Sequence, residues 1–382
     1  MSANVEAFDA WIRSTFVELN TELEELYFAQ EVRARVEGVG DDLKQRILDE
    51  GRVFVRALAE EGNTDEGFDQ AFDVLGDLGL YMASLRRHEL TNPAREHRSP
   101  HEEATALGLH IGASVGVVPR FATSHLATHN LARNGRQKSF TSLPDEFLFL
   151  DYNTRGILAY KRAADALARI APLGISHPVS ETLFDDARTA LDDVGRFNDV
   201  LFAELDVDRF FYSVRPYYKP YRVGRQEYRG ANAGDFSGIN EIDLLLGLCR
   251  GNDPYYAQLL VEKMLFMRPE DQESLRDCLR RPSFLDQFLD ALGSSGDQEW
   301  FRRNAAAFLR VCEQHGRVAA QHHDQLVARF IEQITASGPP LPALLASLEV
   351  LRDLRLAAVR DDIPSRHADV ERLRAAIGVA AS

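Results

Sequence analysis

Two adjacent histidines stand at the centre of RVAAQHHDQLVARFI, residues 317–331, and an imidazole can bind a metal ion or move a proton. On a helix of about 3.6 residues per turn the apolar residues form one stripe, and His323 lies in its middle. His322 is turned about 100° away, so we expect it at the edge of the stripe or in water. An unpaired buried polar group costs roughly 1–3 kcal/mol, so a buried His323 needs a partner. From this segment alone, that partner is either a hydrogen-bonding group of the core or a metal ion.

Other metal and cofactor motifs are absent from the sequence. Cys249, Cys278 and Cys312 form no disulfide framework, no Cys-x-x-Cys zinc site and no Cys-x-x-Cys-His haem attachment site. His315 and His322 share a helix face, but two turns separate them by roughly 10 Å, which is too far for one zinc ion. There is no H-E-x-x-H, P-loop or G-x-G-x-x-G motif. Three reduced thiols, with Cys312 and His315 as a chance pair, are the simplest interpretation.

Composition restricts the class of protein. The chain has 382 residues, 45% of them hydrophobic and 27% charged, which is typical of a folded globular protein and favours two domains. A net charge of −15 without a long basic run opposes binding to nucleic acid and to anionic membranes. No apolar run approaches the roughly 18 residues of a membrane span, and the opening MSANVEAFDAW is not a signal peptide. We therefore expect a cytoplasmic protein.

Helical periodicity covers most of the chain. Apolar residues recur at i, i+3, i+4 and i+7 in segment after segment, and no alternating strand pattern is present, so the sequence predicts an all-α fold. The predicted helices include 5–27, 41–61, 68–90, a helix from about 102, one short helix within 116–135, 148–174, 181–205, one long helix 300–334, 341–358 and 365–378. The connector QKSFTSLPDE, residues 137–146, is the best candidate for a domain boundary.

One segment, residues 210–248, interrupts the helical pattern. It is rich in aromatic residues, arginine and glycine, and Pro216 and Pro220 prevent a regular helix across its first half. Long irregular segments of compact domains are usually functional. Arg215 can bind a carboxylate with two hydrogen bonds, or it forms a structural ion pair. The small residues 231–238 allow close approach to a ligand, or they form a plain solvent loop.

Five sequence blocks occur in the order found in a known family. They are LGDLGLYMASLRRHE, VVPRFATSHLATHN, SFTSLPDE, FFYSVRPYYKPYRVGRQEYRG and HHDQLVARFI. In these blocks the chain resembles the haem-dependent dioxygenase superfamily of indoleamine 2,3-dioxygenase. The block RPYYKPYRVGRQEY is similar to the branch of monodechloroaminopyrrolnitrin synthase, which rearranges a chlorinated tryptophan in antibiotic biosynthesis.

The resemblance implies an indoleamine 2,3-dioxygenase-like helical fold with haem between two domains. Residues 1–138 would form a small N-terminal domain covering the distal side, and residues 139–382 a large haem-binding domain. The cofactor would be non-covalent haem b, with O2 as co-substrate. The proximal iron ligand of the family is the histidine followed by x-x-[LI]-[VA]-x-[KR]-[FYA]-[IY], which here is His323. A neutral imidazole there leaves the sixth iron position open for dioxygen.

The resemblance also implies a substrate site. Arg215 matches the arginine that pairs with the substrate carboxylate, and Thr154 falls where the dioxygenase has a distal serine. The remaining matches are the pocket-lining Thr123 and Leu126, the distal loop residues Asn232, Ala233 and Gly234, and His125, a catalytic candidate that helix geometry turns away from the pocket. Asp235 replaces a glutamine of the dioxygenase, and it either favours a cationic side chain or caps the next helix.

The implied function is oxygen-dependent oxidation of a free amino acid, tryptophan or a relative of it, in secondary metabolism. Hydroxylation of a tyrosine-like amino acid, or of the guanidine nitrogen of arginine, is the alternative within the superfamily. A haem-binding sensor without turnover and a helical scaffold without haem are alternatives of other classes. An external electron source and a homodimer stay open. One departure concerns haem binding, because Ala320 replaces an arginine that can reach a propionate; either Arg317 substitutes for it or the propionates are held elsewhere.

Overall fold

The structure is a computed structural model that describes residues 2–62, 67–231, 234–327 and 341–379. Most described residues are helical, which confirms the all-α prediction. The chain forms two compact units, and each is described by itself. The first comprises 1–153, 204–235 and 265–269, and the second comprises 154–203, 236–264 and 270–382. The sequence-based boundary at residue 138 therefore falls within the first unit.

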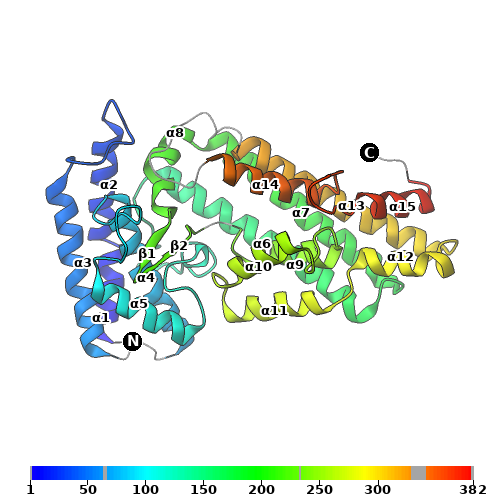
Figure 1. Ribbon diagram of the computed structural model, residues 1–382, viewed down its shortest axis with the longest axis horizontal. Helices are drawn as coiled ribbons and strands as arrows, with labels where there is room; N and C mark the ends of the chain where they lie inside the picture. Colours follow the sequence, from blue (N-terminus) through cyan, green and yellow to red (C-terminus); the bar gives the residue numbers. More distant parts are fainter. Residues whose placement is uncertain (1, 63–66, 232–233, 328–340, 380–382) are drawn as a thin grey trace. The chain divides into compact units, whose positions relative to one another are not determined.

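The first unit is a helical assembly, and its helices are the blue and cyan ones in Figure 1. Its helices are α1 (Ala3–Ile12), α2 (Thr15–Phe28), α3 (Asp41–Glu61), α4 (Phe68–Arg87) and α5 (Glu102–Val115). Every residue of α4 from Val74 to Arg87 is buried, whereas the other helices of the unit keep an exposed face. A helix that is apolar on most sides is expected at the centre of a core.

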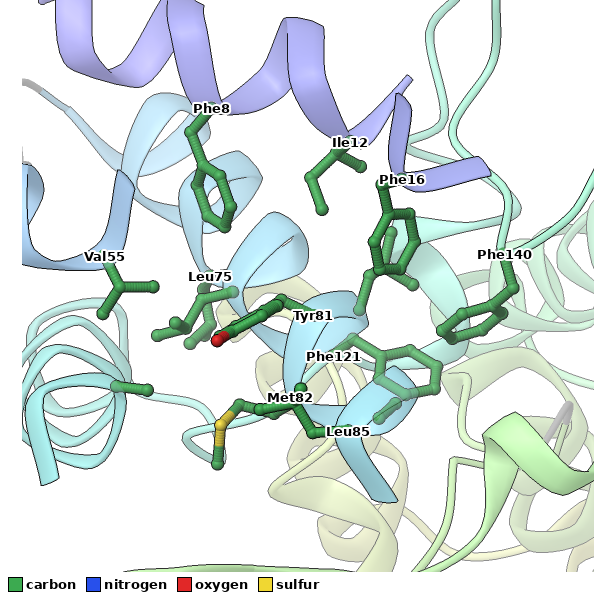
Figure 2. Packing of buried hydrophobic residues seen from close by; sticks show 14 of the residues in the cluster. Phe8, Ile12, Phe16, Val55, Leu75, Tyr81, Met82, Leu85, Phe121 and Phe140 are labelled. Carbon is green, nitrogen blue, oxygen red and sulfur yellow. The ribbon is translucent and has the colours of Figure 1, made fainter. Parts of the chain in front are cut away.

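Aromatic and aliphatic side chains from several segments meet beside α4. Figure 2 shows Phe8, Ile12 and Phe16 facing Leu75, Tyr81 and Leu85, with Phe121 and Phe140 closing one side. The rings of Phe121 and Phe140 lie edge to face, 5.5 Å apart. These contacts fix the two non-helical segments that follow α5 onto the core of the first unit.

The irregular segments of the first unit contain short turns and one hairpin. Thr123–His125 is a 3-10 turn, η1, so the predicted helix within 116–135 is wrong. The later segment comprises α8 (Val207–Arg209), the π-helix η2 (Phe210–Val214), the 3-10 turn η3 (Arg215–Tyr218), and the antiparallel strands β1 (Tyr221–Val223) and β2 (Gln226–Tyr228). Within the described residues, this hairpin is the only pair of strands.

The second unit is also helical. Its elements are most of α6 (Pro144–Leu173), α7 (Pro178–Glu204), α9 (Ser237–Leu246), α10 (Pro254–Met264), α11 (Pro269–Arg280), α12 (Phe284–Ser295), α13 (Glu299–Gln321), η4 (His322–Val327), α14 (Leu341–Arg355) and α15 (His367–Ile377). The predicted helices 341–358 and 365–378 are confirmed. Phe184, Phe288 and Phe308 form an aromatic contact among α7, α12 and α13.

The described part of the chain contains no helix with both the length and the apolarity of a membrane span. The three cysteines are free, as the sequence suggested, and the structure shows that they are also buried. Burial raises the pKa of the Cys249, Cys278 and Cys312 thiols, so none of them is an activated thiolate.

Candidate functional site

His323 lies where the α-helix α13 changes to the π-helix η4. Its side chain is only 16% exposed. Nδ1 lies 3.0 Å from Oδ1 of Asp324 and 3.2 Å from Nη1 of Arg352 on α14. With a proton on Nδ1, donated to Asp324, the free lone pair of the imidazole is on Nε2. A carboxylate on one ring nitrogen is a common arrangement around a histidine that binds a metal through the other.

His322 is half-buried, which agrees with its predicted position at the edge of the apolar stripe. Burial, reinforced by the charge of Arg355, lowers the pKa of its imidazole to about 4. His322 begins the π-helix η4, whose i→i+5 hydrogen bonds add a residue to the turn. The 3.6-residue phase therefore fails after Gln321, and the predicted continuous helix 300–334 changes character at His322.

Arg317 of α13 faces α7, another helix of the second unit. It is exposed and lines a groove with Asp192, Gly195 and Asp199 of α7. Ala320, the position at which relatives have arginine, is half-buried.

A buried charge cluster joins α9, α13 and α14, and its α13 member, His315, lies two turns before the histidine pair. Asp243 accepts hydrogen bonds from His315 Nε2 at 2.7 Å, from Tyr256 Oη at 2.8 Å, and from Arg355 at 2.9 and 2.8 Å. Burial opposes the charge of Asp243, but Arg355 and His315 hold the pKa of its carboxyl well below its usual range. Nε2 of His315 is thus hydrogen-bonded to a carboxylate, and the Cys-x-x-His spacing between Cys312 and His315 is incidental.

Arg215 begins η3 in the first unit, directly after the π-helix η2. Its guanidinium lies 5.5 Å from the centre of the Phe211 ring. Its side chain is half-buried, and burial lowers its pKa. A partly desolvated guanidinium beside an aromatic ring binds a planar carboxylate well. The position is therefore compatible with the substrate-binding role predicted for it.

Asp235 is fully buried and accepts a hydrogen bond of 2.5 Å from Arg229 Nη2. The Arg229 guanidinium also lies over the Phe266 ring, 4.3 Å from its centre. The negative charge of Asp235 is therefore already neutralised by an arginine of this chain. This pairing removes the reason to expect a cationic substrate side chain there.

Two further contacts hold residues 228–230, which precede the segment of small residues 231–238. The fully buried Arg120 donates from Nη1 to the carbonyl of Arg229 at 2.5 Å and to that of Tyr228 at 3.4 Å. A Cβ at Gly230 would lie 2.0 Å from the Tyr218 carbonyl oxygen, so only glycine fits without movement. The start of the loop is thus held against η3, the element of Arg215.

His125 is buried and stacked on Phe72, with ring centres 3.9 Å apart. Its Nδ1 accepts from the Ala122 N–H at 2.9 Å, and its Nε2 donates to the Phe72 carbonyl at 2.9 Å. Burial and the charge of Lys138 lower the pKa of His125 to about 3. Both nitrogens are engaged by backbone, which favours a structural role over proton transfer.

The other predicted residues are distributed over both units. Thr123 and Leu126 are buried in the same turn as His125, and Gly234 directly precedes Asp235 in the first unit. Thr154 is a half-buried residue of α6 in the second unit, the unit of His323. Asn232 and Ala233 lie outside the described residues.

Sequence reasoning missed several contacts of these residues. Asp324 was visible as the residue after His323, but nothing local marked it as a partner. Arg352 is 29 residues from His323, and Asp243 is 112 residues from Arg355. A buried aspartate within an apolar helix, as in INEIDLLLG, is the one signal that could have pointed to the Asp243 cluster.

One comparison with known proteins bears on the chain. The model of the family described as monodechloroaminopyrrolnitrin synthase PrnB matches residues 2–377, nearly all of the 382 residues. The family is one of pyrrolnitrin biosynthesis enzymes that act on a tryptophan-derived substrate. The match confirms the resemblance of the sequence blocks to this branch. The chain therefore belongs to the monodechloroaminopyrrolnitrin synthase PrnB family of enzymes.

Proposed function

We propose that the protein is a haem-dependent oxygenase acting on a free, tryptophan-derived amino acid, with His323 as the iron ligand. The observation that carries the proposal is the environment of His323. It is a shielded imidazole with a carboxylate on Nδ1, within a protein whose family uses a tryptophan-derived substrate. The donor set fits haem iron, which binds a neutral imidazole through one nitrogen.

In this proposal, Arg215 binds the substrate carboxylate with two parallel hydrogen bonds and so orients the amino acid. Thr154 offers a hydroxyl that can form a hydrogen bond with the substrate amine or with O2. Haem, when bound, supplies the redox chemistry with O2. Thr123 and Leu126 shape the pocket, and Gly234 provides a small residue near the cofactor.

An indole substrate is preferred over a cationic one. Asp235 was the only sequence feature that suggested a substrate such as arginine, and its carboxylate is paired with Arg229. His125 enters the proposal only as a residue that holds its turn, because both of its ring nitrogens contact backbone.

The test is an absorption spectrum of the protein reconstituted with haem, in the ferric state and in the ferrous state with carbon monoxide. His323→Ala should lose or shift the Soret band, whereas His322→Ala, the matched control one residue away, should keep the wild-type band. Tryptophan should then perturb the band of the wild type, and Arg215→Gln should need a higher tryptophan concentration. A wild type without a specific Soret band, or with a band indifferent to His323→Ala, overturns the proposal.

A further inference from the structure

Two groups of opposite charge contact one nitrogen of His323. Asp324 Oδ1 lies 3.0 Å from Nδ1, and Arg352 Nη1 lies 3.2 Å from the same atom. A carboxylate can only accept a hydrogen bond there, and a guanidinium can only donate one. Nδ1 of a neutral imidazole either carries a proton or carries a lone pair. It cannot satisfy both groups at once.

The two choices have different consequences for the other ring nitrogen. When Nδ1 carries the proton and donates to Asp324, Nε2 has a lone pair and can bind a metal. When Nδ1 accepts from Arg352, the proton of the neutral ring is on Nε2, which then cannot bind a metal. Asp324 therefore favours the ligating tautomer of His323, and Arg352 favours the other.

We propose that Asp324 and Arg352 are opposing positioning residues that set the tautomer of His323 and thereby the strength of its bond to iron. This inference rests on the proposed role of His323 as iron ligand. By linkage, occupation of Nε2 and donation from Arg352 to Nδ1 exclude each other, so each weakens the other by the same factor.

Arg352 has other partners to which it can move. Its guanidinium lies 2.8 Å from Asp353 Oδ1 and 3.3 Å from Glu349 Oε1, both on the same helix, α14. It can therefore release Nδ1 and stay paired, so the exchange leaves no unpaired charge in this half-buried region. Asp324 is the adjacent residue in the chain and remains beside the ring in either case.

The experiment compares Asp324→Ala and Arg352→Met in the full chain reconstituted with haem. The two readouts are the rate of haem transfer to excess apomyoglobin and the ferrous iron–histidine stretching band in resonance Raman spectra. Asp324→Ala should release haem faster, by about tenfold for one charge-assisted hydrogen bond, and should lower the band frequency. Arg352→Met should release haem more slowly and raise the frequency.

Two exposed residues provide matched controls. Asp361→Ala and Arg372→Met remove the same charges at positions with no contact to His323 in the described part of the chain, and both should behave as the wild type. Arg352→Lys retains the charge without the planar fork and should fall between the wild type and Arg352→Met. Thermal unfolding of the haem-free variants identifies any that fail to fold, in which case Arg352→Lys and Asp324→Asn carry the comparison.

Opposite signs for the two substitutions support the inference. Shifts of the same sign, or wild-type values in both variants, overturn it even when His323→Ala abolishes the Soret band. A Soret band that survives His323→Ala instead defeats the proposed function, so the two failures are distinguishable.

Discussion

Arg355 holds Asp243 through two parallel hydrogen bonds, from Nε to Oδ1 at 2.9 Å and from Nη2 to Oδ2 at 2.8 Å. Both side chains are buried, and His315 and Tyr256 complete the hydrogen bonding of the carboxylate. One carboxylate thus ties α9 to α13, which leads into η4 with His323, and to α14, which carries Arg352. The second unit should depend on this pair for its stability.

Removing one member of this pair leaves the other charged and buried. We expect Arg355→Met and Asp243→Leu each to lower the free energy of unfolding by about 3–5 kcal/mol. The double variant should lose less than the sum of the two, because no charge is left unpaired. Urea titration of the haem-free proteins measures all three values, and strictly additive losses would contradict the pairing.

The Arg229–Asp235 pair makes a separate prediction in the first unit. Arg229→Met leaves the buried Asp235 without its guanidinium and should destabilise the protein by about 2 kcal/mol, a lower value because Arg229 is partly exposed. Adding Asp235→Asn should recover much of that loss. Asp235→Asn alone should leave the relative affinity for tryptophan and arginine unchanged. A selective loss of arginine binding in that variant would show that Asp235 faces the substrate.

His125 should make stability depend on pH. Its pKa is lowered to about 3 in the folded chain by burial and by the charge of Lys138, whereas an exposed histidine has a pKa of about 6.5. Between these values the unfolded chain binds more protons, so stability is present above pH 6.5 and is lost as the pH falls. From pH 7 to pH 5 this group should account for about 2 kcal/mol. His125→Gln should show that much less pH dependence in urea titrations, and an unchanged slope would contradict the buried neutral ring.

Alanine substitutions at Gly230 and Gly156 should have opposite effects on the protein. A Cβ at Gly230 would lie 2.0 Å from the Tyr218 carbonyl oxygen, so Gly230→Ala must displace the chain beside η3 and should weaken substrate binding at Arg215. A Cβ at Gly156, within α6, meets nothing within 4 Å, so Gly156→Ala should stabilise the helix by about 0.5–1 kcal/mol. Thermal unfolding and tryptophan titration separate the two. Equal behaviour of the two variants would argue against a close approach at Gly230.

Much of the fold could be predicted because helix formation depends on residues that are close together in the sequence. The apolar periodicity of 41–61 and 68–90 corresponds to α3 and α4. Pro364 separates α14 from α15, and Gly378 follows the end of α15. The family and His323 came from blocks of adjacent residues, which are also local information. His323 as iron ligand stays a prediction that the spectra will test.

Local reasoning failed where the backbone departs from its usual period. The π-helix at His322 shifts the phase of the following residues, and the 3-10 turn at Thr123–His125 replaces a predicted helix. The turn at Thr123–His125 contacts another segment through the His125 ring, which stacks on Phe72.

The sequence by itself determined which segments form helices, because hydrogen bonds between near neighbours and the burial of one face follow from adjacent residues. Only the tertiary structure decided the partners of the buried charges: Arg355 for Asp243, Arg229 for Asp235, and Arg352 beside His323. A chain this rich in both arginine and acidic residues offers many possible pairs, and packing between distant segments selects among them because only the selected partners can neutralise a charge removed from water.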